Sequence, residues 1–194
     1  MQNELDDAVI KASRLVQDAE KILVVTGAGI STDSGIPDFR GPDGVWTKNP
    51  ELEKASHIDY YVNDPEIRKY NWRFRASGEL WPNIRPNAGH IALLNLEKQD
   101  KLHTIVTQNV DGLHQAAGSD PKKVVEIHGN VQEAVCLSCD WRDKIEPVLE
   151  RVRKGEEDPH CECGGLIKTA TILFGQNLIP EDLKRMLEAD VNVL

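Results

Sequence analysis

The sequence contains no run of about 18 apolar residues, the length that a membrane-spanning helix needs. Positive charge is also in deficit, because 23 Lys and Arg residues stand against 32 Asp and Glu residues and give a net charge of −9. This balance argues against direct binding of nucleic acid, which depends on a basic surface that releases phosphate counterions. An acidic protein is compatible with basic peptide substrates, although many proteins are acidic for solubility alone. We therefore expect no membrane segment and no nucleic-acid partner.

Residues 1–20 lack the basic and then apolar pattern of a signal peptide, and they are too acidic for a mitochondrial transit peptide. Only 4 of the 194 residues are cysteines, and a chain of this length can bury enough surface to fold without disulfides. We expect a cytoplasmic protein whose thiols stay reduced. The length fits one domain, with room for a small inserted module.

Short apolar runs rich in β-branched residues alternate along the chain with segments of helical periodicity. The expected strands are 21–26, 103–107, 123–127 and 169–174, and the expected helices include 6–19, 88–98 and 180–190. Strands that alternate with helices predict an α/β fold, in which a parallel sheet carries helices on both faces.

The four cysteines form two close pairs, Cys136-x-x-Cys139 and Cys161-x-Cys163. Two pairs of thiolates in a reducing compartment suit a tetrahedral Zn²⁺ site. The second pair is shorter than the usual C-x-x-C, and His160 could replace one of the thiolates. Four incidental thiols are the alternative. The sequence offers no open coordination position and no acidic partner, so we expect one structural rather than catalytic zinc ion.

The expected strand 21–26 runs directly into Gly27-Ala28-Gly29, where a backbone could approach a pyrophosphate at a helix N-terminus. The third glycine of a dinucleotide fingerprint would fall at Thr32, and Gly35 comes three residues later. No second strand follows to carry the acidic residue that binds a ribose. An ordinary dehydrogenase is therefore disfavoured, and a tight turn without a ligand stays open as an alternative.

Three longer motifs follow one another in a fixed order: residues 27–40 (GAGISTDSGIPDFR), 107–114 (TQNVDGLH) and 126–129 (EIHG). The two cysteine pairs and then Phe174-Gly175-Gln176 come after them. This order resembles the sirtuin (Sir2) family of NAD-dependent protein deacylases, and the match covers nearly the whole chain.

The resemblance implies a Rossmann-type NAD-binding domain with two insertions. The NAD-binding domain would comprise residues 1–43, 100–133 and 168–194, the helical module residues 44–99 and the zinc-binding module residues 134–167. Sirtuins continue after the helix at 180–190 with strand–helix units that bind the adenosine half of NAD. We therefore expect this chain to be truncated at its C-terminus, with that part of the sheet missing.

The resemblance also implies an activity: removal of acyl groups, most simply acetyl, from protein lysines. NAD would be consumed as a co-substrate, giving nicotinamide and O-acyl-ADP-ribose. His128 would act as the general base, for which an imidazole suits a neutral working pH, and Asn109 would orient the carboxamide of the leaving nicotinamide. The other residues implied to bind NAD are Gly27, Ala28, Gly29, Ile36, Asp38, Phe39, Arg40, Gln108 and Asp111.

The resemblance implies fewer residues that would contact the peptide substrate and its acyl group. Phe174 and Gly175 would pair with the acyl-lysine peptide through main-chain hydrogen bonds. Sirtuins that remove succinyl or malonyl groups carry a Tyr-x-x-Arg pair, and the nearest equivalent is Trp72-Arg73-Phe74-Arg75. Arg75 could bind an acyl carboxylate, or the segment could be a solvated helix face. An ADP-ribosyltransferase of the same family and an inactive zinc-binding fragment are the alternative functions, and the oligomeric state is open.

Overall fold

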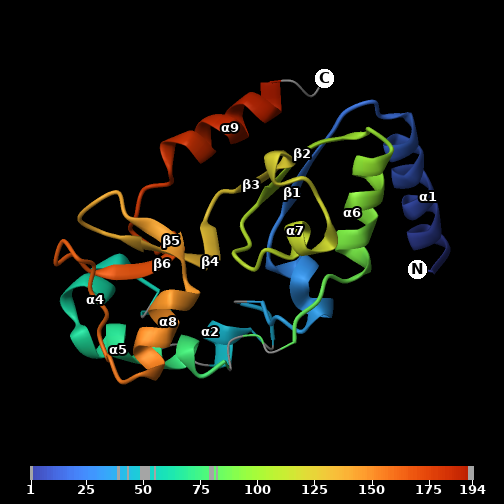
Figure 1. Cartoon of the computed structure of the whole chain (residues 1–194). Coiled ribbons are helices and arrows are strands. Elements are labelled where there is room, and N and C mark those ends of the chain that lie inside the picture. The colour runs from blue at the N-terminus through green and yellow to red at the C-terminus, as the bar shows by residue number, and fades with distance from the viewer. Residues whose placement is uncertain are drawn as a thin grey trace.

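Two three-stranded sheets organise the part of the chain that the structure describes (Figure 1). The structure is a computed structural model, and the residues it describes are 2–38, 40–42, 44–48, 53–54, 56–78, 81 and 83–191. The two sheets are joined directly, because the last strand of the first sheet is followed by the first strand of the second.

The first sheet is parallel, with the strand order β1-β2-β3. Its strands are β1 (Ile22–Thr26), β2 (Leu102–Thr107) and β3 (Val124–Glu126). The central strand β2 is almost fully buried, which is typical of a parallel strand covered on both faces.

Neighbouring side chains of β2 point into two different cores. Ile105 belongs to a cluster that α6 (Ala88–Lys98) covers with Leu93 and Leu96. Val106 belongs to a second cluster, on which Met186 of α9 (Pro180–Val191) packs. Since successive side chains of a strand face opposite sides, helices cover both faces of the sheet, and the expected α/β fold is confirmed.

The second sheet is antiparallel and has the order β5-β4-β6. It consists of β4 (Gly129–Cys136), β5 (Arg142–Lys144) and β6 (Ile167–Thr171). The sequence pattern had predicted strand 169–174 as a further strand of the parallel sheet, and this placement is wrong. Every residue of β6 is buried, so the strand shows no alternation of buried and exposed side chains that could indicate the direction of its neighbour.

The remaining helices are short apart from the first. They are α1 (Gln2–Asp18), α2 (Val45–Lys48), α4 (Ile58–Asn63), α5 (Pro65–Ala76), α7 (Leu113–Ala117), α8 (Glu146–Arg153), and the 3₁₀ turns η1 (Ala28–Ser34) and η2 (Pro121–Lys123). The start of α5 is specified locally, because Asp64 caps the backbone N–H groups of Glu66 and Ile67 and Pro65 occupies the first turn. Among the described residues, no helix combines the length and the apolar character needed to cross a bilayer.

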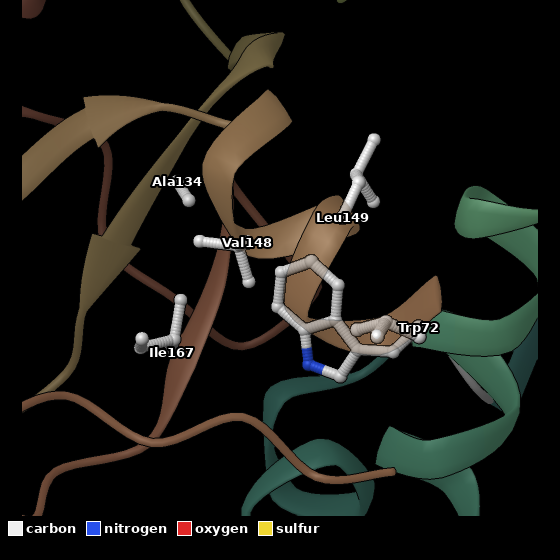
Figure 2. Packing of buried hydrophobic residues seen from close by; sticks show 6 residues of the cluster. Trp72, Ala134, Val148, Leu149 and Ile167 are labelled. Carbon is white, nitrogen blue, oxygen red and sulfur yellow. The ribbon is translucent and has the colours of Figure 1, made fainter. Parts of the chain in front are cut away.

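Helices α5 and α8 pack on the second sheet around one indole ring (Figure 2). Trp72 of α5 is 1% exposed and lies against Val148 and Leu149 of α8 and Ile167 of β6. Burial of a side chain this large contributes a substantial share of the local stability. The helical segment and the cysteine-bearing segment therefore share one core.

A buried ion pair fastens α5 to the loop that follows α8. The Arg68 guanidinium, 6% exposed, donates to Asp158 from Nε (3.0 Å) and Nη2 (2.8 Å). Its Nη1 donates to the carbonyl oxygens of Tyr61 (3.0 Å) and Val62 (2.9 Å). These bonds satisfy the guanidinium and hold the turn between α4 and α5.

We expect Arg68→Ala to lower the free energy of unfolding by about 3 kcal/mol, because the change leaves Asp158 and two carbonyls without their donor. Urea denaturation followed by circular dichroism measures it. Lys69→Ala is the matched control, since Lys69 pairs with Glu66 at the surface and exposed pairs stabilise little. Equal effects of the two substitutions would contradict the structural importance of the buried pair.

Candidate functional site

The three parallel strands end at one edge of the first sheet, and all three sequence motifs meet there. The backbone N–H of Gln108, just after β2, donates to Thr26 O at the end of β1 (2.9 Å). The N–H of Ile127, just after β3, donates to Thr107 O (3.0 Å). Ligands of open α/β sheets bind outside the carboxyl ends of the strands, so this edge is the candidate site.

The glycine loop forms the first wall of the site. Gly27 follows β1, and Ala28 and Gly29 begin the 3₁₀ turn η1, which ends at Gly35 with a φ of 89°. A Cβ added to Gly27 or Gly29 would meet no heavy atom within 4 Å. The backbone on this side is therefore open to a ligand, as close approach of a phosphate requires.

A buried polar network joins this loop to the segment after β2. Asn109 donates from Nδ2 to Gly27 O (3.1 Å) and to Ser31 Oγ (3.0 Å). Ser31, 1% exposed, donates in turn to Asp111 Oδ2 (2.8 Å), and Asp111 Oδ1 accepts from the N–H of Leu113 (2.9 Å). No described residue donates to Asn109 Oδ1, so this oxygen is left to accept a hydrogen bond from a ligand.

Ser31 is the residue of this network that sequence reasoning did not select. It lies inside the motif 27–40, but a serine in a glycine-rich turn is common and carries no periodic signal. Its role becomes visible only in the hydrogen bonds that connect it to Asn109 and Asp111. A search for polar residues one turn after the glycines would have found it.

His128 lies half-buried two residues after the end of β3. Its Nδ1 is 3.1 Å from Gln108 O, and since a carbonyl oxygen only accepts, Nδ1 carries the proton of the neutral ring. Nε2 then holds a free lone pair, which is what a general base needs. Gly129 fixes the next position, because its φ is 71° and an added Cβ would lie 1.8 Å from Ala170 O.

The remaining residues of the first motif form a loop beside η1. Ile36 is 6% exposed. The carboxylate of Asp38 accepts from the N–H of Gly41 (2.8 Å), which closes a local turn. Phe39 lies outside the described residues. Asp38 therefore shapes the loop, while a contact of Ile36 or Asp38 with a ligand stays a prediction.

A row of side chains in contact leads from this loop towards the segment around Phe174. The Arg40 guanidinium lies 4.7 Å from the centre of the Trp46 ring. The Trp46 ring is 5.4 Å from that of Phe174, which is 5.1 Å from the ring of His57. Arg40, at the end of the first motif, is thus connected through Trp46 to Phe174 in the segment after β6.

The main-chain N–H and carbonyl of Phe174 are both hydrogen-bonded within the chain. Its N–H donates to Ser56 O (2.9 Å), and its carbonyl accepts from the N–H of Ile58 (3.0 Å). A peptide strand would instead have to pair at Gly175, which is exposed and has a φ of 84°. Arg75, the other predicted substrate residue, lies on α5 and lines a hollow together with Trp72 and Lys168.

The four cysteines form a separate cluster at the end of β4. The Sγ atoms are 3.6 Å apart for Cys136 and Cys163, 3.7 Å for Cys139 and Cys161, and 3.5 Å for Cys139 and Cys163. All four lie within 4.8 Å of one another, and a tetrahedral zinc with bonds of about 2.3 Å needs sulfur separations of about 3.8 Å. The cluster therefore fits one Zn²⁺, while His160 stays outside it and turns its Nδ1 to Asp158 O (2.8 Å).

Two buried histidines lie beneath the site. His114, 1% exposed, places Nε2 3.0 Å from Thr26 Oγ1, and its ring centre is 5.0 Å from that of His90. Burial, and secondarily the neighbouring His90, lower the pKa of His114 to about 4, although Asp111 acts in the opposite direction. His114 therefore stays neutral at physiological pH and acts as a structural group.

This depressed pKa predicts acid sensitivity of the fold. Below pH 6.5 the unfolded chain binds a proton at His114, whereas the folded chain does not bind it until about pH 4. The free energy of unfolding should therefore fall by about 3 kcal/mol between pH 7 and pH 4 from this residue. Urea titrations across this range should show a shallower fall for His114→Gln than for the original chain or for His103→Gln. An unchanged slope in His114→Gln would refute the assignment.

Comparisons with known proteins agree with this arrangement. The model of the Sir2 family matches residues 27–194. NAD-dependent protein deacetylase 2 of Streptomyces coelicolor is 47% identical over 160 residues, which cover 82% of this chain and 66% of that protein. The NAD-dependent protein deacetylase of Sulfolobus acidocaldarius is 44% identical over 170 residues, which cover 86% of this chain and 64% of that protein. The chain thus spans about two thirds of the length of these relatives.

Solved structures are similar over most of the chain. One described as "Structural Basis for the Mechanism and Regulation of Sir2 Enzymes" has a TM-score of 0.82 and 34% identity, and covers 97% of this chain and 73% of that chain. Another, described as "Sir2-p53 peptide-NAD+", has a TM-score of 0.78 and 34% identity, and covers 94% of this chain and 71% of that chain.

Proposed function

Because this chain belongs to the Sir2 family, we propose that it removes acyl groups, most simply acetyl, from protein lysines in a reaction that consumes NAD. The products would be the free lysine, nicotinamide and O-acyl-ADP-ribose. The observation that carries the proposal is the meeting of an open glycine loop, Asn109 and His128 at one sheet edge. Acylated-lysine proteins are the proposed partners.

The residues at the edge suit the parts of NAD. The open backbone at Gly27 and Gly29 would receive the phosphates. The free Oδ1 of Asn109 would accept from the nicotinamide carboxamide, while Asp111 keeps Ser31 and Asn109 in place from below. When bound, NAD supplies an activated bond between nicotinamide and ribose. Ala28, Ile36, Asp38, Phe39, Arg40 and Gln108 complete the proposed lining.

His128 would move the proton in the acyl transfer. Its free Nε2 would accept the proton of the hydroxyl group that attacks the acyl carbon. The hydrogen bond from Nδ1 to Gln108 O supports this role, because it fixes the tautomer and stabilises the ring when it becomes protonated. This hydrogen bond thus joins His128 to the segment that carries Asn109.

On the substrate side, Gly175 is the proposed pairing point for the peptide, with Phe174 as a side-chain contact. Arg75 is the proposed contact for a polar acyl end. We also keep three modules as a proposal: residues 44–99, residues 134–167 with a structural zinc, and the NAD-binding remainder. None of the four cysteines forms a disulfide, and we also propose a cytoplasmic location, where thiols stay reduced.

The test is incubation of the chain with NAD and an acetyl-lysine peptide, with nicotinamide followed by chromatography and the peptide by mass spectrometry. We expect nicotinamide release matched by loss of acetyl from the peptide. Nicotinamide release with an unchanged acetyl-peptide and labelling of protein would instead indicate ADP-ribosyl transfer. Binding of NAD without either product would refute turnover by this chain.

A further inference from the structure

The loop of residues 109–113, between β2 and α7, carries two polar residues of the candidate site, Asn109 and Asp111. The main-chain oxygen of Asp111 accepts from Gln132 Nε2 (2.9 Å), at the start of the second sheet. This bond fixes the middle of the loop. The beginning of the loop, with Asn109, is held by a different set of bonds, which leads to a histidine of α7.

Two buried threonine hydroxyls connect Asn109 to the neighbouring strand. Thr26 ends β1 and Thr107 ends β2, and the two residues are paired across the parallel sheet. Thr26 Oγ1 donates to Thr107 Oγ1 (2.8 Å), which also accepts from the main-chain N–H of Asn109 (3.1 Å). The threonines are 7% and 2% exposed, so water competes little with these bonds. The position of the Asn109 main chain therefore depends on the hydroxyl of Thr107.

His114 completes this series of hydrogen bonds from the first turn of α7. Its Nε2 lies 3.0 Å from Thr26 Oγ1. A hydroxyl has one hydrogen to donate, and the hydrogen of Thr26 is used for Thr107. Thr26 must therefore accept, and Nε2 of His114 must donate. The hydrogen bonds thus run in one direction, from His114 through Thr26 to Thr107.

These bonds close a ring that contains the loop. From Asn109 the chain passes through residues 110–113 to His114, whose side chain returns through the two threonines to the N–H of Asn109. Helix α7 has only 5 residues, and a helix this short is not stable by itself. The bond from His114 therefore has a large part in placing it. We refer to Thr26, Thr107 and His114 as the loop clamp.

An apolar side chain would fill the position of His114 more favourably. When Nε2 carries the proton, Nδ1 of the neutral ring keeps a lone pair, and this nitrogen is buried without a hydrogen-bond partner among the described residues. A buried acceptor without a donor is unfavourable. A methionine or leucine would avoid this disadvantage but could not donate to Thr26. The donor at Nε2 is therefore the property that distinguishes a histidine at this place.

We propose that His114 is a positioning residue of the deacylation reaction. Its bond to Thr26 keeps the loop 109–113 closed, and so holds Asn109 where the free Oδ1 can accept from the nicotinamide carboxamide. His114 acts through the threonines and touches no substrate. The effect on the reaction rests on the proposed function, whereas the clamp itself does not. A displacement of about 1 Å at a substrate-binding group can lower a rate by about 10².

Hydrogen exchange measured by NMR on the chain without NAD tests the clamp. His114→Met and His114→Gln introduce side chains of nearly the same shape, but only glutamine keeps a donor that can reach Thr26. We expect the Asn109 amide to exchange about tenfold faster in His114→Met and to stay within about threefold in His114→Gln. The amide of Ile105, 0% exposed in β2, is the internal reference. Unchanged exchange at Asn109 in His114→Met would refute the clamp.

Kinetics with NAD and an acetyl-lysine peptide test the consequence for the reaction. His114→Met and Thr26→Val should each lower kcat/KM for NAD by about tenfold or more, while Thr26→Ser, which keeps the hydroxyl, is the matched control. The KM for the peptide should stay unchanged, because no bond of the clamp involves Phe174 or Gly175.

A double variant distinguishes positioning from a general loss of stability. His114→Met combined with Thr26→Val should be no slower than either single variant, since both changes interrupt the same series of bonds. Additive losses would indicate two unrelated structural effects and overturn the proposal.

The two measurements also separate this proposal from the proposed function. Faster exchange at Asn109 in a chain that converts no NAD would confirm the clamp and count against the proposed function. Faster exchange with an unchanged kcat/KM for NAD would refute the positioning role of His114. An equal fall of kcat/KM in His114→Gln and His114→Met would refute it as well, because the donor would then be irrelevant.

Discussion

Replacing His128 with alanine should lower the rate of deacylation by a factor of about 10²–10⁴, the range by which general acid–base catalysis contributes. The imidazole lies two residues after β3, with Nδ1 donating to Gln108 O and Nε2 free to accept a proton. Alanine removes the proton acceptor without disturbing a packed core, since the ring is only half-buried. The measurement is the turnover of an acetyl-lysine peptide at saturating NAD.

Two controls separate chemistry from folding in this experiment. His128→Ala should keep the far-ultraviolet circular dichroism spectrum and the NAD affinity of the original chain. His103→Ala removes a half-exposed histidine from β2, and its rate should stay close to the original. A variant of His128 that retains more than about a tenth of the rate would show that another group accepts the proton.

The parallel sheet could be predicted because its strands are continuous apolar runs. Strands β1 and β2 lie within one residue of the expected ranges 21–26 and 103–107. Strand β3 is shorter than the expected 123–127 and ends at Glu126. The chain nevertheless continues in the sheet's direction, because the N–H of Ile127 still bonds to Thr107 O.

The antiparallel sheet escaped prediction for a physical reason. All three residues of β5, Arg142–Lys144, are exposed and polar, so the strand has no hydrophobic pattern and exists only through its pairing with β4. Strand β4 starts at Gly129, whose positive φ is needed for the close approach to Ala170. Such a contact between segments about 40 residues apart leaves no local signal.

The residues at the site could be predicted because they occur together in the sequence motifs. The tautomers and main-chain hydrogen bonds of these residues could not. The order of motifs placed Asn109, Asp111 and His128 at one edge. The tautomer of His128 depends on Gln108 O, a main-chain atom. The occupied main chain of Phe174 depends likewise on Ser56 and Ile58. Backbone hydrogen bonds depend on the fold, so the identity of the residues alone does not predict them.

Removal of zinc should produce the largest loss of stability in this protein. The four Sγ atoms lie within 4.8 Å of one another, so without a metal at least some must be protonated to avoid repulsion between thiolates. Little apolar burial compensates, since Cys139 and Cys163 are exposed. Zinc binding is worth roughly 10–16 kcal/mol in small zinc modules, and a part of that free energy should be lost here.

The loss should spread beyond the cysteine loops. Cys136 ends β4, and its N–H bonds to Trp141 O (3.0 Å), while Leu137 bonds to Leu166 just before β6 (2.9 Å). Release of the metal therefore loosens the sheet against which Trp72 and the α5 helix pack. We expect chelation to reduce the Tm by more than about 10 °C and to weaken the near-ultraviolet signal of the tryptophans.

The measurement combines metal analysis with thermal unfolding. One zinc ion per chain is expected, and EDTA should lower the Tm, whereas EDTA already saturated with Zn²⁺ should not. Cys161→Ser should reproduce the effect of chelation, because an alcohol is a poor zinc ligand. Glu162→Gln is the matched control, because Glu162 lies between Cys161 and Cys163. A chain that contains no metal, or a Cys161→Ser variant as stable as the original, would mean that the protein holds this cluster together by packing alone.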